Sequence, residues 1–179
     1  EIWFMADLHL NHSNILKHSG RPYLKVSEMN KDFIDQLQQI KENDYLFDLG
    51  DLFWKTDPSQ IENVIKNNIK TKHFWKILGN HDKESMYRDK LSKYFEGISE
   101  SLDLSIKIPG QAEEESKVIT LSLDHYPKVS WNNKPRGSLM IHGHCVDQST
   151  EILTLDGWKF YNEINIGDNI YSYNSTTDK

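Results

Sequence analysis

Short apolar runs alternate with longer stretches of helical period along most of the chain. The runs are rich in aromatic and branched residues and have the length of buried strands. They are Ile2 to Ala6, Tyr45 to Leu49, Phe74 to Leu78, Val118 to Leu123 and Ser138 to Ile141. Strands that alternate with helices are typical of an α/β fold. We therefore predict an α/β domain with a layered sheet and flanking helices.

Two segments between these runs carry apolar residues at spacings of three and four, as an amphipathic helix requires. Ser27 precedes the first periodic stretch and Asp57-Pro58 precedes the second, where a helix needs a cap and accepts a first-turn proline. Each predicted helix has one apolar face to pack on the sheet. The faces are Met29, Phe33, Leu37 and Ile40 in the first, and Ile61, Val64, Ile65 and Ile69 in the second.

Two further segments interrupt the α/β pattern. Residues 109–116 combine turn formers with three adjacent acids, which is typical of a solvated hairpin connection. From residue 145 onward, strand-like runs are separated by Asp156-Gly157 and Gly167-Asp168, which are turn sequences. We therefore predict an all-β segment over residues 145–179 and place a boundary between residues 144 and 145.

Composition narrows the class of protein. The chain is 37% hydrophobic with a formal net charge of -6, and no block of like charges is long enough to suggest a nucleic-acid-binding tail, which argues against broad electrostatic binding of nucleic acid. No apolar run approaches a membrane span and no signal peptide is recognisable, so we expect a cytoplasmic protein. A lone cysteine, Cys145, excludes an intramolecular disulfide. The chain starts without Met inside an apolar run, so we expect a fragment.

Each predicted strand runs into side chains that can ligate metals. Because the carboxyl ends of parallel strands gather at one edge of a sheet, these side chains should converge. Asp7 and His9 are two residues apart, so in extended backbone they would point to the same side. The side chains that follow the five strands are Asp7 and His9, then Asp51, then Asn80, His81 and Asp82, then Asp124 and His125, and finally His142 and His144.

This mixture of carboxylate, imidazole and amide groups suits Mn, Fe, Co, Ni or Zn better than Ca or Mg, which prefer oxygen ligands. Two such ions bridged by one carboxylate, about 3.5 to 4 Å apart, would hold a phosphate and activate a water. The sequence therefore favours metal-dependent hydrolysis of a phosphoester.

Residues 1–144 resemble the calcineurin-like metallophosphoesterases, through Asp7-x-His9, Gly50-Asp51, Gly79-Asn80-His81-Asp82, His125 and Gly143-His144. The resemblance implies that Asp7 and His9 hold one divalent ion, that Asp51 bridges, and that Asn80, His125 and His144 hold the second. It also implies that His81 is the general acid, oriented by Asp82. The opening Asp7 to His12 with Arg21-Pro22 resembles a small subgroup of bacteria and their phages.

Basic side chains at three places near these motifs each allow two interpretations. His12 would either touch substrate, or lie at the surface or behind the metal ligands. Arg21 would either grip a phosphate or be an exposed cation beside Pro22. His142 and His144 could supply two ligands from one strand end, although the family pattern is Gly-His-x-His.

The family places a further His two positions after His144, but this chain has Val146 there. Between them stands Cys145, and the following sequence resembles the start of a Hint-type intein, with Thr150-Glu151-Ile152-Leu153-Thr154 and Gly157 in the expected order. The Cys145 thiol could attack the carbonyl of His144 and begin splicing. We therefore predict an incomplete metallophosphoesterase domain over 1–144, followed by the first part of an intein over 145–179.

The partner of this chain would be the complementary C-terminal half of a split intein with its C-extein, or the missing remainder of a contiguous intein. Phosphoester hydrolysis should stay impaired until splicing supplies the last His ligand. Two alternatives stay open: a complete hydrolase with a native β-tail, in which Cys145 is a buried residue, or a metal-binding module without turnover. Small phosphoesters and nucleotides are the expected substrates, and nucleic-acid ends are not excluded.

Overall fold

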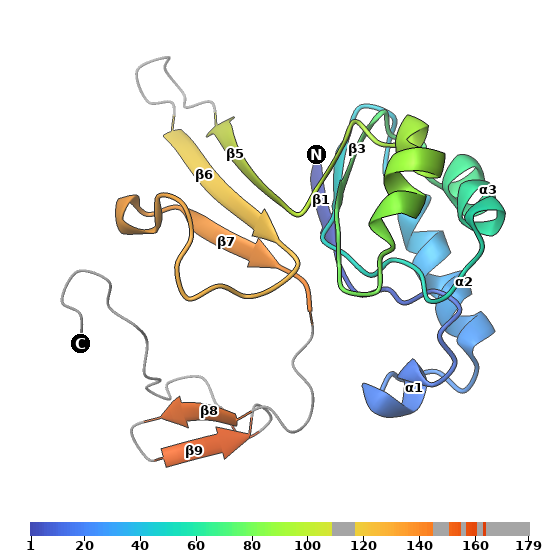
Figure 1. Cartoon of the computed structure of the whole chain (residues 1–179), viewed down its shortest axis with the longest axis horizontal. Helices are drawn as coiled ribbons and strands as arrows, with labels where there is room; N and C mark the ends of the chain where they lie inside the picture. The colour runs from blue at the N-terminus through green and yellow to red at the C-terminus, as the bar shows by residue number, and fades with distance from the viewer. Residues whose placement is uncertain (109–116, 145–150, 155–156, 161–162, 164–179) are drawn as a thin grey trace.

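The computed structural model describes residues 1–108, 117–144, 151–154, 157–160 and 163. Its first sheet has four parallel strands in the order β1-β2-β3-β4, which are β1 (Ile2–Met5), β2 (Tyr45–Asp48), β3 (His73–Ile77) and β4 (Gly97–Ser99). Helices connect these strands, and all but the short first one lie along one face of the sheet (Figure 1). They are α1 (Ile15–His18), α2 (Val26–Leu37), α3 (Pro58–Asn68), the π-helical η1 (Met86–Leu91) and the 3-10 turn η2 (Ser92–Tyr94).

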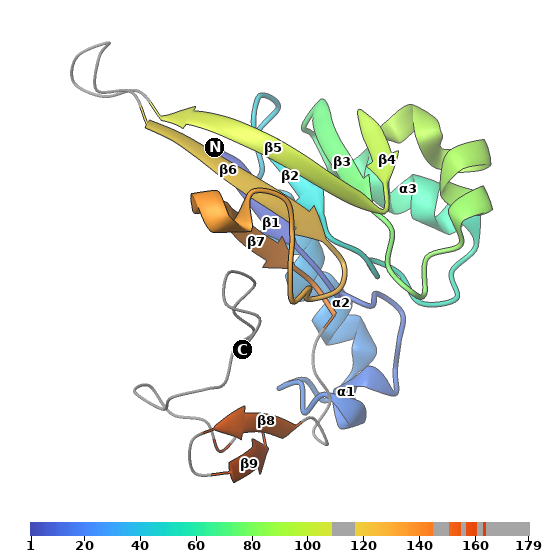
Figure 2. The same cartoon turned by 60° about the vertical axis from the view of Figure 1, so that its left-hand side comes forward.

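A second sheet, ordered β5-β6-β7, covers the other face of the parallel sheet (Figure 2). Strand β5 (Ser101–Ile108) pairs antiparallel with β6 (Lys117–Asp124), and β6 pairs parallel with β7 (Leu139–His142), which follows the short turn η4 (Lys134–Arg136). A separate two-stranded sheet is formed by β8 (Glu151–Thr154) and β9 (Gly157–Phe160). The predicted hairpin connection at 109–116 lies outside the described residues, but the strands that it joins pair antiparallel.

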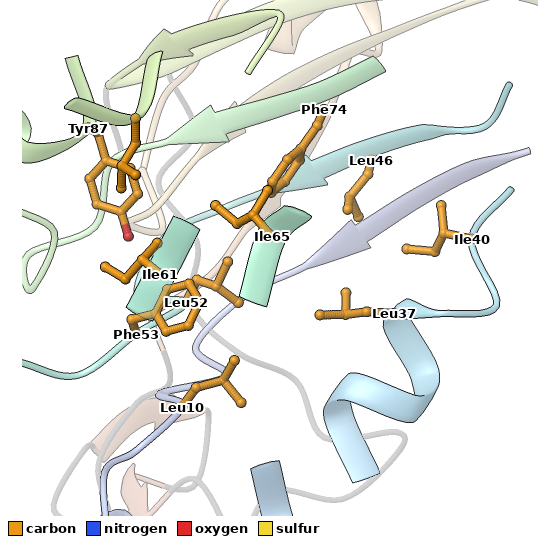
Figure 3. Packing of buried hydrophobic residues seen from close by; sticks show 11 residues of the cluster. Leu10, Leu37, Ile40, Leu46, Leu52, Phe53, Ile61, Ile65, Phe74 and Tyr87 are labelled. Atoms are coloured by element: carbon orange, nitrogen blue, oxygen red, sulfur yellow. The ribbon is translucent and has the colours of Figure 1, made fainter. Parts of the chain in front are cut away.

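Alternating side chains of the parallel strands enter two different cores. Leu46 of β2 and Phe74 of β3 pack against the helices, as Figure 3 shows. The next residues, Phe47 and Trp75, face the second sheet, where Phe4 stacks on Phe47 at 5.5 Å between ring centroids. A strand that is apolar on both faces is buried between two layers. The parallel sheet is therefore the central layer, and its carboxyl ends open at the edge that carries the predicted site.

The five predicted strands are confirmed to within about one residue at most ends, but they do not belong to one sheet. The last two lie in the second sheet together with β5, which was not predicted although its residues alternate in burial. Both amphipathic helices are confirmed. Asp57 is the N-cap of α3 and Pro58 its first residue, whereas α2 begins after Lys25, so Ser27 is not the cap.

The predicted all-β segment is described only in part, as β8 and β9; Cys145 and Val146 lie outside the described residues.

In the part of the chain that the structure describes, no helix has the length and apolar character needed to cross a membrane.

Candidate metal centre

The first predicted ligands lie on left-handed turns rather than on a strand. Strand β1 ends at Met5, and Asp7 and His9 have φ of 52° and 48°. The expectation that extended backbone brings them together is therefore wrong. Their backbone N–H groups donate to the carbonyls of Gly50 and Asp51, each at 3.0 Å. These bonds bring Asp7 Oδ1 to 3.7 Å from His9 Nε2.

Asp51 lies at the centre of the site, with a φ of 58° and only 1% of its surface exposed. Its Oδ2 atom is 3.9 Å from His9 Nε2, 3.9 Å from His81 Nε2 and 3.6 Å from His125 Nε2. These separations are too long for hydrogen bonds. Two atoms that share one ion at about 2.0 to 2.2 Å are commonly about 3 to 4 Å apart, so the spacing fits a metal between them.

The orientation of His125 also fits a metal ligand. Its Nδ1 lies 2.8 Å from the carbonyl oxygen of Leu49, and because a carbonyl only accepts, Nδ1 must carry the hydrogen. In the neutral ring, Nε2 then presents a lone pair toward Asn80 Oδ1, which is 2.9 Å away and is also an acceptor. With this orientation of the Asn80 amide, two acceptors face each other, as two ligands of one metal ion do. A backbone carbonyl behind the ring is the usual support of a metal-binding His.

The carboxylate and imidazole atoms of three predicted ligands form a compact group. One ligand atom from each of Asp7, Asp51 and His125 lies within 4.8 Å of the other two, and all three residues are buried. His144 lies beside this group, with its ring 5.1 Å from the ring of His125 and 4.7 Å from that of Tyr126. The structure thus brings together the ends of β1, β2, β3, β6 and β7.

Two glycines leave the space that these side chains occupy. A Cβ atom on Gly79 would lie 2.2 Å from Oδ1 of Asp51, and one on Gly50 would lie 2.3 Å from Nδ1 of His125. Gly50 also has a φ of 111°, a conformation that side chains rarely tolerate. The glycines of the Gly-Asp and Gly-Asn-His-Asp motifs are therefore needed because the site residues pack directly on them.

The motif around His81 has contacts of two kinds. The backbone N–H of His81 donates to Asp51 Oδ1 at 2.9 Å, while the side chain stays 38% exposed and meets the ring of Trp54 at 4.4 Å. The Asp82 carboxylate points the other way, into the protein, where its Oδ2 accepts from the N–H groups of Gly79 and Asp51. Any effect of Asp82 on His81 therefore passes through the loop backbone.

The basic side chains near the site contact the protein itself. Arg21 is half-buried and donates to the carbonyl oxygens of Asp7 and Leu8, so it supports the backbone of the first loop. His142 Nδ1 lies 2.7 Å from the carbonyl oxygen of Gly143, which the ring N–H can reach. His12 lies flat on Trp54, with ring centroids 3.8 Å apart.

Two features of the site were not predicted from the sequence. Trp54 borders a cavity of about 750 Å³ that reaches Asn80 and His81 and has Phe53, Ile61 and Met86 among its apolar lining residues. Lys76 is completely buried beneath the site. The sequence gives one sign of this buried charge, which is a lysine inside the otherwise apolar run Phe74 to Leu78.

The model of the family described as "Calcineurin-like phosphoesterase" matches residues 1–174. The chain belongs to this family. A calcineurin-like phosphoesterase is a hydrolase of phosphoesters, and its members typically bind divalent metals, which agrees with the Asp7, Asp51 and His125 group. The matched range includes most of the predicted intein segment as well as residues 1–144, so it gives no boundary at residue 144. The bacterial or phage origin, the intein and the identity of the metal remain predictions.

Two relatives have no described activity. The uncharacterized protein MJ1445 of Methanocaldococcus jannaschii is 32% identical over 84 residues, which are 46% of this chain and 47% of that protein. This calcineurin-like phosphoesterase thus spans about half the length of the archaeal relative. The crystal structure of the protein of unknown function AQ665 from Aquifex aeolicus matches with a TM-score of 0.52 and 26% identity, over 80% of this chain and 77% of that one.

Proposed function

We propose that this domain hydrolyses a phosphomonoester or phosphodiester with two divalent metal ions, and that both ions are manganese. The observation that carries the proposal is the position of Asp51 Oδ2, which lies 3.9 Å from His9 Nε2 and 3.6 Å from His125 Nε2. In the proposed centre Asp51 bridges the ions; Asp7 and His9 hold the first, and Asn80, His125 and His144 hold the second. The ions would supply the Lewis acid that polarises the phosphoryl group and acidifies the attacking water.

The residues of the chain would orient the substrate and move the proton. His81 is the proposed general acid, because its ring is the most exposed imidazole around Asp51 and borders the cavity beside the site. Its backbone N–H donates to Asp51 Oδ1, which holds the backbone of His81 next to the proposed bridging carboxylate. The proton would pass from the His81 ring to the leaving-group oxygen on the cavity side.

The cavity next to His81 is large enough for a leaving group of nucleotide size. Trp54 and Met86 offer apolar contact, and Lys55, Lys83 and Lys90 lie among its lining residues. We therefore propose a small phosphoester or nucleotide as substrate. Asp57 and Asp89 also line the cavity, so the proposal rests on its size and apolar contacts more than on net charge.

The test is hydrolysis of a model phosphodiester with Mn²⁺ by the full chain and by Asp51→Asn. The variant should lose at least about a hundredfold in rate, because it removes the charge shared by both ions. Asp35→Asn is the matched control, since it removes an exposed carboxylate on α2 that pairs only with Lys31 among the described ion pairs. Metal binding without any metal-dependent turnover in both the full chain and its spliced product would instead favour a module that only binds metal.

We further propose that residues 1–144 are an N-extein and that residues 145–179 are the start of an intein. Cys145 would be the splicing nucleophile. Support comes from the sequence: Cys145 follows His144 where the family motif breaks off at Val146. The strand pair β8–β9 falls where the intein resemblance expects strands, and a native β-tail would also contain it.

Splicing is tested by mixing the chain with a matching C-terminal intein half and measuring masses. The expected product joins residue 144 to the C-extein, and Cys145→Ala should block it. A mixture that yields no spliced product and no release at His144 would favour a complete hydrolase with a native tail. Phosphodiester hydrolysis of the spliced product should exceed that of the unspliced chain, and equal rates would contradict the missing ligand.

A further inference from the structure

Lys76 is a buried cation that the proposed chemistry does not use. It lies on β3 with no exposed surface, on the face of the sheet that packs against the helices. Its Nζ is 4.8 Å from the centre of the Tyr87 ring, which is itself fully buried on η1. Lysine is almost never fully buried unless it is paired, so its partners indicate why it is there.

The two partners of Lys76 lie at the ends of two different strands. Nζ is 2.7 Å from Oδ2 of Asp48, the last residue of β2, and 2.6 Å from Oδ2 of Asp82, in the loop after β3. Both carboxylates are buried, with 0% and 1% of their side-chain surface exposed. One ammonium group therefore connects the loop that carries Asp51 to the loop that carries Asn80.

The same carboxylates hold the backbone of these loops. Asp82 Oδ2 accepts from the N–H of Gly79 at 2.9 Å and from the N–H of Asp51 at 3.0 Å. Asp48 Oδ1 accepts from the N–H of Gly50 at 3.0 Å. Asp82 thus spans both loops by itself, and Lys76 fixes Asp82.

The charge of Lys76 persists in this environment. Burial alone would lower the pKa of its ammonium group, but Asp48, Tyr87 and Asp82 outweigh burial and hold that pKa above its ordinary value. Buried ion pairs give little net stability compared with apolar side chains of the same volume, so stability alone does not account for this arrangement.

We propose that Lys76 is a positioning residue for the metal centre, which acts through Asp82 and Asp48 to fix the Asp51 loop relative to the Asn80 loop. The inference rests on the proposed function, because it requires that Asp51 and Asn80 bind metal. Groups behind metal ligands typically change metal affinity about 10-fold to 100-fold when they are altered. A purely structural lysine would change the stability of the fold but not the affinity of the folded protein for metal.

The test is the Mn²⁺ affinity of the full 179-residue chain, measured from the electron paramagnetic resonance signal of free Mn²⁺. Lys76→Met is combined with Asp48→Asn, so that removal of the cation does not leave two unpaired buried carboxylates. The expected result is an affinity about tenfold or more below that of the unaltered chain. Ile77→Val is the matched control: it changes the next buried residue of β3, which faces the other core, and should bind Mn²⁺ normally.

Each outcome decides between the alternatives. A folded double variant whose affinity is within about threefold of the unaltered chain would overturn the positioning role, and so would an equal loss in Ile77→Val. If the double variant does not fold, Asp82→Ala is measured instead, because it leaves Lys76 paired with Asp48 and removes the link to Asp51; normal Mn²⁺ affinity there overturns the inference. An unaltered chain that binds no Mn²⁺ would overturn the proposed function itself.

Discussion

The ring of His12 lies parallel to the ring of Trp54, with centroids 3.8 Å apart and planes 5° apart. The same tryptophan meets the edge of His81 at 4.4 Å. Trp54 therefore contacts two imidazoles at the mouth of the site, one three residues after His9 and the other in the Gly-Asn-His-Asp motif. His12 Nδ1 is buried without a hydrogen-bond partner among the described residues, as is Nδ1 of His9.

This stacking should keep His12 uncharged at neutral pH. Burial, together with the smaller effects of His9, His18, His81 and Arg21, lowers the pKa of His12 from 6.5 to about 4. Trp54→Ala should expose the ring and move this pKa back toward 6.5, which NMR titration of the imidazole would measure. Because the folded pKa lies below the unfolded value, the folded chain binds fewer protons between pH 6.5 and 4, and acidification through this window lowers its stability. An unchanged His12 pKa in Trp54→Ala would contradict the role of the stack.

Gly79 should be required for metal binding beyond its effect on folding. Gly79→Ala places a Cβ 2.2 Å from Asp51 Oδ1, so Mn²⁺ affinity should fall about tenfold while the free energy of unfolding drops by about 1 to 3 kcal/mol. Gly97→Ala creates an equally close contact, 2.2 Å from the Trp75 ring, but away from the site. It should destabilise the protein and leave Mn²⁺ affinity unchanged. Equal affinities in the two folded variants, measured by Mn²⁺ titration, would contradict the prediction.

Ile61 should carry a large share of the contact between α3 and the parallel sheet. It is fully buried in the core shown in Figure 3, so Ile61→Ala should lower the free energy of unfolding by about 2 to 5 kcal/mol in a urea titration. Leu24→Ala removes a side chain that is 93% exposed and should change it by less than about 0.5 kcal/mol. Similar effects of the two substitutions would mean that α3 does not depend on this contact.

Val146→His should improve metal binding by the unspliced chain. If position 146 is where the family supplies a further ligand, an imidazole there adds a donor to the first ion, and Mn²⁺ affinity should rise about tenfold or more. Gln148→His adds the same side chain two residues later and should have no such effect. Calorimetric titration with Mn²⁺ compares the two, and equal affinities would argue against a vacant ligand position.

The sequence alone determined strands β1, β2 and β3 of the central sheet but not β4, both amphipathic helices and the family, because each depends on residues that are close together in the chain. Runs of five mostly apolar residues identified β1, β2 and β3, and Asp57-Pro58 marked the start of α3. The motifs Gly50-Asp51 and Gly79-Asn80-His81-Asp82 selected the residues that meet at the site. Strand β5 escaped prediction because its polar face leaves it without a continuous apolar run.

Only the tertiary structure decided how these residues meet. Left-handed turns at Asp7 and His9, rather than an extended strand, bring the first ligands to Asp51, because hydrogen bonds to the neighbouring loop fix their backbone. The division into two sheets could not be derived from local periodicity, since it depends on strand pairing between distant segments. Lys76 pairs with Asp48, which is 28 residues away, and with Asp82, which lies in the loop after β3. The sequence shows only a lysine within a strand, and its role as a buried link between two loops depends on the tertiary structure.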